Sequence, residues 1–154
     1  MKKVIVFFSY SNNTRKLVKA INKEFNYDIK EIERKIPYSN VYDICAYKEA
    51  KEEVDKNIHP EIKPLNLNIH EYDEILLFFP IWWYTFPMPI ATFIDTLKGY
   101  KGKVILFMNS YTNDYQYVLN SIKDFKKINP SIKVEEGLFN KSIQEHIIFL
   151  RKEN

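Results

Sequence analysis

Glycine is scarce in this chain: its 154 residues include only Gly99, Gly102 and Gly137. Glycine-rich phosphate loops are therefore excluded, and neither the G-x-G-x-x-G pattern of dinucleotide-binding folds nor the G-x-x-x-x-G-K-[ST] pattern of P-loops occurs. Loops that need a positive φ angle must use asparagine or aspartate, the next most tolerant residues. Four asparagines fall where loops are expected, namely Asn12, Asn13, Asn109 and Asn113.

Cysteine and long apolar runs are also scarce. The single cysteine, Cys45, excludes an internal disulfide and any cysteine pair for a metal or redox site, which fits a reducing cytosol. No apolar run approaches the roughly 18 to 20 residues of a membrane helix, and the basic start leads into only five apolar residues, Val4 to Phe8. We therefore expect a cytoplasmic protein without membrane contact, in which any redox chemistry comes from a cofactor.

The charges indicate neither a nucleic-acid surface nor a metal site. The formal charge is +3, from 23 basic and 20 acidic residues that are scattered along the chain without a lysine or arginine block. We expect an ordinary mixed surface that binds no nucleic acid. The three histidines, His59, His70 and His146, lie far apart without ligand spacing. Each is predicted to be a surface or loop residue, and no metal site is expected.

Apolar stretches with strand character alternate with helical patterns. The strands are expected at Lys3 to Phe8, Asp28 to Lys35, Glu74 to Phe79 and Lys103 to Met108, with a weaker fifth candidate at Ile132 to Phe139. Helices are expected at Leu17 to Phe25, Ile90 to Leu97, Val118 to Phe125 and Ser142 to Lys152, with a charged helix near Ala46 to Lys56 in an irregular crossover. The alternation predicts one α/β domain, residues 1–154, with a parallel sheet covered by helices on both sides.

In an open parallel sheet, ligands bind beyond the carboxyl ends of the strands. Three polar or aromatic segments follow those ends: the first loop, Ser9–Thr14 (SYSNNT), the second loop, Pro80–Pro89 (PIWWYTFPMP), and the third loop, Asn109–Tyr115 (NSYTNDY). These three loops are therefore the places to look for function.

The first loop joins a buried strand to a helix start, where unsatisfied backbone N–H groups and the helix dipole favour an anion. Ser9, Ser11, Asn13 and Thr14 add hydroxyl and amide donors without formal charge. Such neutral donors suit a phosphate monoester held without lysine or metal. The same side chains would cap the helix even if no phosphate binds, so both interpretations stay open.

The second loop places four aromatic residues within five positions, namely Trp82, Trp83, Tyr84 and Phe86. Their flat faces could stack on a planar heterocycle, although we expect at least one tryptophan to be mainly structural. The third loop adds amide and hydroxyl groups, with Tyr111 and Tyr115, that could hydrogen-bond the polar edge of the same ring.

A phosphate pocket beside an aromatic clamp favours a flat phosphorylated cofactor such as FMN. Two other uses of this topology are excluded by the residues. A receiver domain needs an acidic cluster after the first strand and an aspartate at the end of the third, where Ser9 and Pro80 stand. A small tyrosine phosphatase needs a cysteine in the first loop, and the only cysteine is Cys45.

Along nearly its whole length the chain resembles the flavodoxin family, in particular short flavodoxin-like proteins whose second loop is similar to P-I-W-W-G. The stretch VIVFFSYSNNTRKL resembles the first strand and phosphate loop of the family, whose pattern is S/T-x-T/S-G-N-T. Asn12 stands where glycine is usual, so it is predicted to supply the positive φ of this loop. The stretches HPEIK, EYDEILLFFPIWWYTFPMPIATFID and KGKVILFMNSYTNDYQYVLNSIKDF follow in the family's order and spacing.

The resemblance implies a three-layer flavodoxin-like fold, with a five-stranded parallel sheet of order 2-1-3-4-5, and one noncovalent FMN. The implied phosphate ligands are Ser9, Ser11, Asn12, Asn13 and Thr14. The implied ring contacts are Pro80, Ile81, Trp82, Trp83 and Tyr84 on one side and Asn109, Ser110, Tyr111 and Thr112 on the other, with Tyr115 covering the ring. Because Tyr84 and the Tyr111–Asn113 turn stand where the family often has glycine, a tighter or more covered ring pocket is expected.

Three functions are open at this point. The first is a flavin redox protein that carries electrons through the isoalloxazine ring to a partner protein. Since the charge is +3, a partner with a mixed or acidic face is expected as readily as a basic one. The second is an FMN-dependent NAD(P)H reductase of quinones or similar acceptors. The third is an apo module that binds a protein through its aromatic loop. No side chain is expected to act as an acid or base, and the chain is expected to be a monomer or homodimer.

Overall fold

The computed structural model describes residues 1–153 and contains one five-stranded sheet of order β2-β1-β3-β4-β5, with every neighbouring pair parallel. The strands are β1 (Lys3–Phe7), β2 (Asp28–Glu31), β3 (Glu74–Pro80), β4 (Lys103–Asn109) and β5 (Lys133–Phe139). The order reverses between β1 and β3, so the carboxyl ends of these two strands flank the expected ligand site. The predicted α/β fold and strand order are confirmed.

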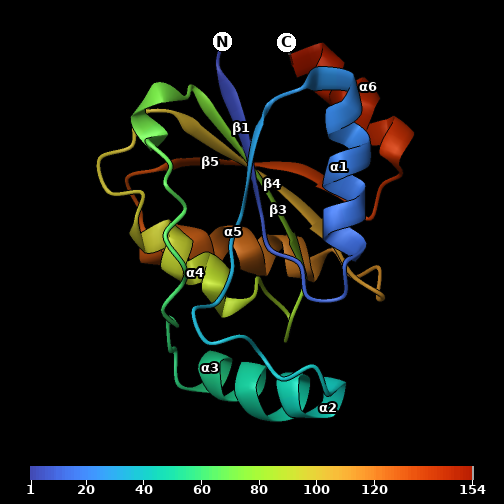
Figure 1. The fold of residues 1–154 in the computed structure, drawn as a ribbon. Helices are drawn as coiled ribbons and strands as arrows, with labels where there is room; N and C mark the ends of the chain where they lie inside the picture. The colour runs from blue at the N-terminus through green and yellow to red at the C-terminus, as the bar shows by residue number, and fades with distance from the viewer. Residues whose placement is uncertain (154) are drawn as a thin grey trace.

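Four long helices cover the two faces of the sheet. Figure 1 shows α1 (Asn13–Phe25) and α6 (Ile143–Glu153) on one face, with α4 (Met88–Asp95) and α5 (Gln116–Ile128) on the other. Side chains of successive strand residues enter opposite cores: Val4 packs with the α4–α5 side and Ile5 with the α1–α6 side. Both faces of the central strands are therefore buried, which explains their nearly continuous apolar sequence.

The crossover from β2 to β3 contains a continuous helical segment, Tyr42–Asp55, which we call the cap helix. It consists of α2 (Tyr42–Ile44), the π-helix η1 (Cys45–Ala50) and α3 (Lys51–Asp55), and a short 3-10 turn, η2 (Ile69–Glu71), follows later. In Figure 1 the cap helix lies beyond the carboxyl edge of the sheet, at the opposite end of the molecule from both termini. The charged helix predicted in the crossover is confirmed, although it begins earlier than expected.

The second strand is shorter than predicted. The Asp28–Lys35 prediction is wrong beyond Glu31, because the chain turns away from the sheet there. The N–H of Ile32 still donates to the Phe7 carbonyl at 2.7 Å, but Arg34 pairs in an antiparallel bridge with Ile62. This departure leads the crossover toward the cap helix.

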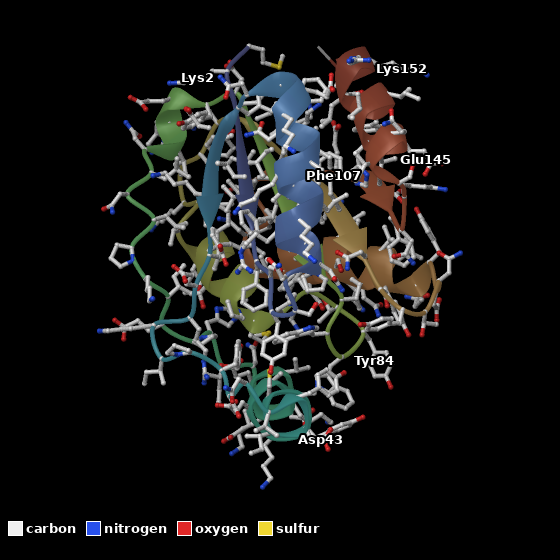
Figure 2. The ribbon with its side chains drawn as sticks, turned by 45° about the vertical axis from the view of Figure 1, so that its right-hand side comes forward. Lys2, Asp43, Tyr84, Phe107, Glu145 and Lys152 are labelled. Carbon is white, nitrogen blue, oxygen red and sulfur yellow. The ribbon has the colours of Figure 1, made fainter. Side chains whose placement is uncertain are left out.

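The surface position predicted for His146 is also wrong. His146 is only 2% exposed and lies on the inner face of α6, with its ring centroid 5.9 Å from that of Phe78 and 5.8 Å from that of Phe107. Figure 2 shows Phe107 in the interior of the molecule. Burial lowers the pKa of His146, so the neutral ring donates from Nδ1 to the Ser142 carbonyl at 2.7 Å. It is a core histidine.

No helix in residues 1–153 is long and apolar enough to cross a membrane. Over the same residues, no group of three or more His, Cys, Asp or Glu side chains is placed to bind a metal ion.

Candidate functional site

Asn12 gives the first loop its shape. Its φ angle is 73° and its ψ angle −5°, in the left-handed region that normally takes glycine. Its side chain does not cap α1; instead its Oδ1 accepts a hydrogen bond from Arg15 Nη1 at 2.8 Å. The prediction that Asn12 supplies the positive φ of this loop is confirmed.

The first loop presents free donors at the start of α1. Within the described part of the chain, no backbone N–H from Ser11 to Thr14 donates a hydrogen bond. Ser9 Oγ accepts from the N–H of Arg15 at 3.3 Å, whereas Ser11 and Asn13 are exposed. These N–H groups and the positive end of the helix dipole form an arrangement that favours an anion.

Thr14 joins the first loop to the third. Thr14 is buried, with 3% of its surface exposed, and its Oγ1 lies 3.3 Å from Asn109 Oδ1. The next residue, Ser110, is fixed by its N–H, which donates to Asn140 Oδ1 at 2.7 Å. The first turn of α1 is thus tied to the end of β4.

The second loop makes a tight turn, Trp82–Thr85. The N–H of Trp82 donates to the Thr85 carbonyl at 2.8 Å, and the reverse bond measures 3.4 Å. Trp83 and Tyr84 between them have φ angles of 51° and 72°. Two successive positive φ angles are the signature of a type I′ turn, which asparagine and glycine usually form, and bulky residues are rare there.

The aromatic residues of the second loop have three different environments. Trp82 packs edge-to-face against Phe8, Tyr10 and Tyr38 with ring centroids 5.3 to 5.6 Å apart, as predicted for one structural tryptophan. Trp83 turns toward the cap helix, and its Nε1 donates to the Ala46 carbonyl at 2.8 Å. Phe86 is 2% exposed and belongs to the core, so it is not one of the rings that face the ligand site.

A pocket of about 240 Å³ opens between the Trp82–Thr85 turn and the cap helix. In Figure 2 the turn, marked by Tyr84, lies at the same end of the molecule as the cap helix, marked by Asp43. The predicted ring contacts that line the pocket are Ile81, Trp82, Trp83, Tyr84 and Ser110. The structure therefore brings residues from the ends of β3 and β4 around one space.

Several predicted contacts lie outside this pocket. Asn109 serves as the partner of Thr14, and Tyr111 projects from the third loop with 98% of its surface exposed. Tyr115 donates its hydroxyl to Glu136 Oε2 on β5 at 2.6 Å and is not among the lining residues. Tyr111 and Tyr115 therefore flank the site without enclosing it.

The cap helix supplies pocket residues that the sequence analysis missed. They are Tyr42, Cys45, Ala46, Tyr47 and Ala50, joined by Tyr10 from the first loop and Tyr117 from α5. Four of the five lie in the π-helix η1, a rare conformation that is frequent at functional sites. The available signal was the run of small and aromatic residues in an otherwise charged helix, CAYKEA.

A buried polar cluster holds the cap helix in place. Tyr38 donates its hydroxyl to Glu53 Oε1, and Arg34 Nε lies 3.3 Å from Glu53 Oε2. The N–H of Ser39 donates to Glu49 Oε1 at 2.7 Å. The segment that follows β2 is thereby attached to the outer helix, which closes the pocket on that side.

Burial keeps two ionisable side chains near the pocket, Cys45 and Tyr38, protonated near neutral pH. Burial raises the pKa of the Cys45 thiol to about 11. Burial and the hydrogen bond to Glu53 raise the pKa of the Tyr38 hydroxyl. Neither side chain is therefore poised as a nucleophile or base, and this site is suited to binding rather than to side-chain catalysis.

Comparison with solved structures supports this architecture. A flavoprotein from Lactobacillus acidophilus NCFM, solved in complex with FMN, is 25% identical with a TM-score of 0.77, covering 88% of this chain and 90% of the other. A candidate flavoprotein from Bacteroides eggerthii is also 25% identical, with a TM-score of 0.82, over 98% of this chain and 96% of the other.

A curated relative matches a short segment. An uncharacterized NAD(P)H oxidoreductase of Escherichia coli K12, YcaK, is 38% identical over 42 residues, which are 27% of this chain and 21% of that protein. The match thus spans about a fifth of the length of this relative. The family model described as flavodoxin matches residues 2–151, so the chain belongs to the flavodoxin family.

Proposed function

We propose that this protein binds one FMN noncovalently and works as a redox protein that passes electrons through the isoalloxazine ring. The observation that carries this proposal is the junction of the first loop and the ring pocket. Thr14 at the anion-favouring helix start is bonded to Asn109, the neighbour of the pocket residue Ser110. A ligand with a phosphate and a flat ring would span these two parts.

The first loop suits the phosphate of FMN. It offers backbone N–H groups from Ser11 to Thr14 and the hydroxyl groups of Ser9 and Ser11. The Thr14 hydroxyl, which donates to Asn109 Oδ1 without a ligand, would turn to the phosphate when it binds. The nearby cation, Arg15, is engaged with Asn12 and with Glu31, whose Oε1 accepts from Arg15 Nε at 3.1 Å. The phosphate would therefore be held mainly by neutral donors and the helix dipole.

The pocket suits a flat ring that keeps one edge in solvent. Its two walls are the indoles of the Trp82–Thr85 turn and the small residues Cys45, Ala46 and Ala50 of the cap helix. Its volume of about 240 Å³ is below the roughly 300–1,000 Å³ of pockets that bury most of a ligand. A ring in this pocket would therefore remain accessible to a redox partner at its edge.

When bound, FMN supplies electron or hydride transfer, while the protein supplies position and restricted access. The cap helix covers one side of the pocket, fixed by Trp83 Nε1 on the Ala46 carbonyl and by the Tyr38–Glu53–Arg34 cluster. A nicotinamide would have to displace this helix to stack on that side. The arrangement supports electron transfer to another protein through an exposed edge of the flavin ring.

The absorption spectrum of the purified protein with added FMN tests the proposal. Binding should shift and structure the flavin bands, quench flavin fluorescence and saturate at one FMN per chain. Riboflavin should bind more weakly because it lacks the phosphate. A protein that binds no FMN after reconstitution would refute the proposal and leave the protein-binding module as the surviving alternative.

An NAD(P)H-dependent reductase is the second candidate, favoured by the likeness over 42 residues to YcaK, an uncharacterized NAD(P)H oxidoreductase. Stopped-flow mixing of the FMN-loaded protein with NADPH and with NADH separates the two functions. Rapid bleaching of bound flavin at low micromolar nucleotide would establish the reductase. Unbleached flavin that dithionite still reduces would support the electron carrier.

A further inference from the structure

The Trp82–Thr85 turn holds an unfavourable backbone conformation. Left-handed φ angles are unfavourable for ordinary L-residues because Cβ comes too close to the following carbonyl oxygen, and both Trp83 (51°) and Tyr84 (72°) have them. Such strain persists only when surrounding contacts fix the backbone. The turn therefore needs anchors that a glycine-containing turn would not need.

The anchors come from one face of α5. Asn120 Nδ2 donates to the Tyr84 carbonyl at 3.0 Å, and Thr85 Oγ1 donates to Asp124 Oδ2 at 2.7 Å. Asn120 is itself oriented by Gln116, whose Nε2 donates to Asn120 Oδ1 at 2.9 Å. Residues 120 and 124 are four positions apart and thus neighbours on the helix surface.

The same bonds determine which backbone groups the turn can offer a ligand. The carbonyls of Trp82 and Tyr84 already accept hydrogen bonds, from Thr85 and Asn120. Among the described residues, the N–H groups of Trp83 and Tyr84 donate to no partner. The clamped turn therefore has hydrogen-bond donors left for a ligand, which suits the acceptor nitrogen and oxygen atoms of a flavin ring.

We propose that Asn120, assisted by Asp124, is a positioning residue of the flavin site that holds the Trp82–Thr85 turn in a backbone shape that glycine would adopt unaided. The role in binding rests on the proposed FMN function, because the ring is what the turn would meet. The conformational role can be measured without any flavin.

The test is a double-mutant cycle on Asn120 and Tyr84, read out with riboflavin and FMN. Asn120→Ala should raise both dissociation constants about five- to tenfold, as expected from one lost hydrogen bond of about 1 kcal/mol or slightly more. Asn120→Asp keeps the side-chain shape but cannot donate a hydrogen bond to the Tyr84 carbonyl, so it should raise both dissociation constants by a similar factor. In a Tyr84→Gly background, Asn120→Ala should change riboflavin affinity by less than about twofold, because glycine relieves the strain.

Asn129→Ala is the matched control. Asn129 also donates from its side chain to a backbone carbonyl, that of Ile94 at 3.4 Å, but at the far end of α5. This variant should leave the riboflavin affinity unchanged even if it lowers the unfolding free energy. Two results would overturn the proposal. One is that Asn120→Ala lowers riboflavin affinity equally in the wild-type and the Tyr84→Gly backgrounds, and the other is that it does not lower the affinity in the wild-type background.

Amide hydrogen exchange of the apo protein separates this proposal from the FMN function. Asn120→Ala should speed exchange of the Trp82 and Thr85 amides, which close the turn, and Tyr84→Gly should restore their protection in the double variant. If the wild-type protein binds no flavin but the two variants change amide exchange in this way, only the proposed function fails. If the Trp82 and Thr85 amides exchange at the same rate in Asn120→Ala as in the wild-type protein, Asn120 does not hold the turn and the proposal is refuted.

Discussion

Substitutions at Asn12 should separate backbone shape from side-chain contact in the first loop. Asn12 has a φ angle of 73° and also accepts a hydrogen bond from Arg15 Nη1 at 2.8 Å. Asn12→Gly removes the contact but allows the left-handed backbone freely, whereas Asn12→Val removes the contact and resists that backbone. The difference between the two variants therefore measures the conformational requirement alone.

The magnitudes follow from these two effects. The Arg15 side chain is 30% exposed and also pairs with Glu31, so its bond to Asn12 contributes about 0.5–1 kcal/mol. Glycine regains a similar amount by relieving the left-handed strain, so FMN affinity of Asn12→Gly should stay within about threefold of wild type. A branched residue adds roughly 1–2 kcal/mol of strain to the lost bond, which predicts about 10- to 100-fold weaker FMN binding for Asn12→Val.

The assay is titration by flavin fluorescence, paired with urea unfolding of the apo protein. Asn26 provides the control, because it also has a positive φ, 55°, but at the opposite end of α1. Asn26→Val should lower the unfolding free energy without changing FMN affinity. If Asn12→Gly and Asn12→Val bind FMN equally well, the backbone of the first loop is not under constraint and the reasoning is wrong.

Three further outcomes are expected. Thr14→Ala should weaken FMN binding about five- to thirtyfold by loss of a bond to a charged acceptor, with less than about twofold change for riboflavin, in parallel titrations. Cys45, whose pKa is raised by burial from 9.0 to about 11, should react with a disulfide reagent at least about 100-fold more slowly in the native than in the unfolded protein, and added FMN should slow it further. Because burial lowers the pKa of His146 from 6.5, its stabilising contribution is present above that value and is lost as the pH falls through the lowered pKa. Between about pH 7 and pH 5 the unfolding free energy should fall less steeply in His146→Gln than in the exposed control His70→Gln. The two slopes should differ by at most about 1.4 kcal/mol per pH unit. Equal slopes would contradict the assignment of His146 as a buried neutral histidine.

The sheet could be predicted because its central strands are buried on both faces. Continuous apolar runs such as Val4 to Phe8 indicate strands that are buried on both faces, and between them apolar residues recur with the period of a helix. The end of β2 could not be predicted, because Ile32 continues the apolar pattern after the chain has left the sheet. His146 was misplaced because a histidine on an apolar helix face resembles an exposed one until its packing is known.

The site could be predicted only where strand ends determine it. The three loops converge because parallel strands end at one edge, and Thr14 and Asn109 meet there as the topology requires. The cap helix could not be placed, since its position depends on long-range contacts such as Trp83 with Ala46. The pocket wall formed by Cys45 and Ala46 was missed for the same reason.

The scarcity of glycine also had consequences that the sequence only partly indicated. Of the four asparagines singled out in expected loops, only Asn12 has a positive φ in the described structure; others with positive φ are Asn26, Asn57, Asn66 and Asn140. The sequence therefore predicted that asparagines would take left-handed positions in place of glycine, but it did not predict which asparagines. At Trp83 and Tyr84 the left-handed residues are not even asparagines, so these positions depend on tertiary contacts.

Replacing glycine changes when the site acquires its shape. A glycine loop can take many backbone conformations, so a ligand must order it on binding. Here Arg15 anchors Asn12 and Asn120 anchors Tyr84, so the unfavourable conformations are already imposed when the chain folds. As long as these anchors hold, the cost is borne by folding stability rather than by ligand affinity, since a preorganised loop loses less entropy when it binds. A substitution that releases the loop, such as Asn12→Val, moves the cost to ligand binding. The first loop and the Trp82–Thr85 turn should therefore keep the same backbone conformation with and without FMN.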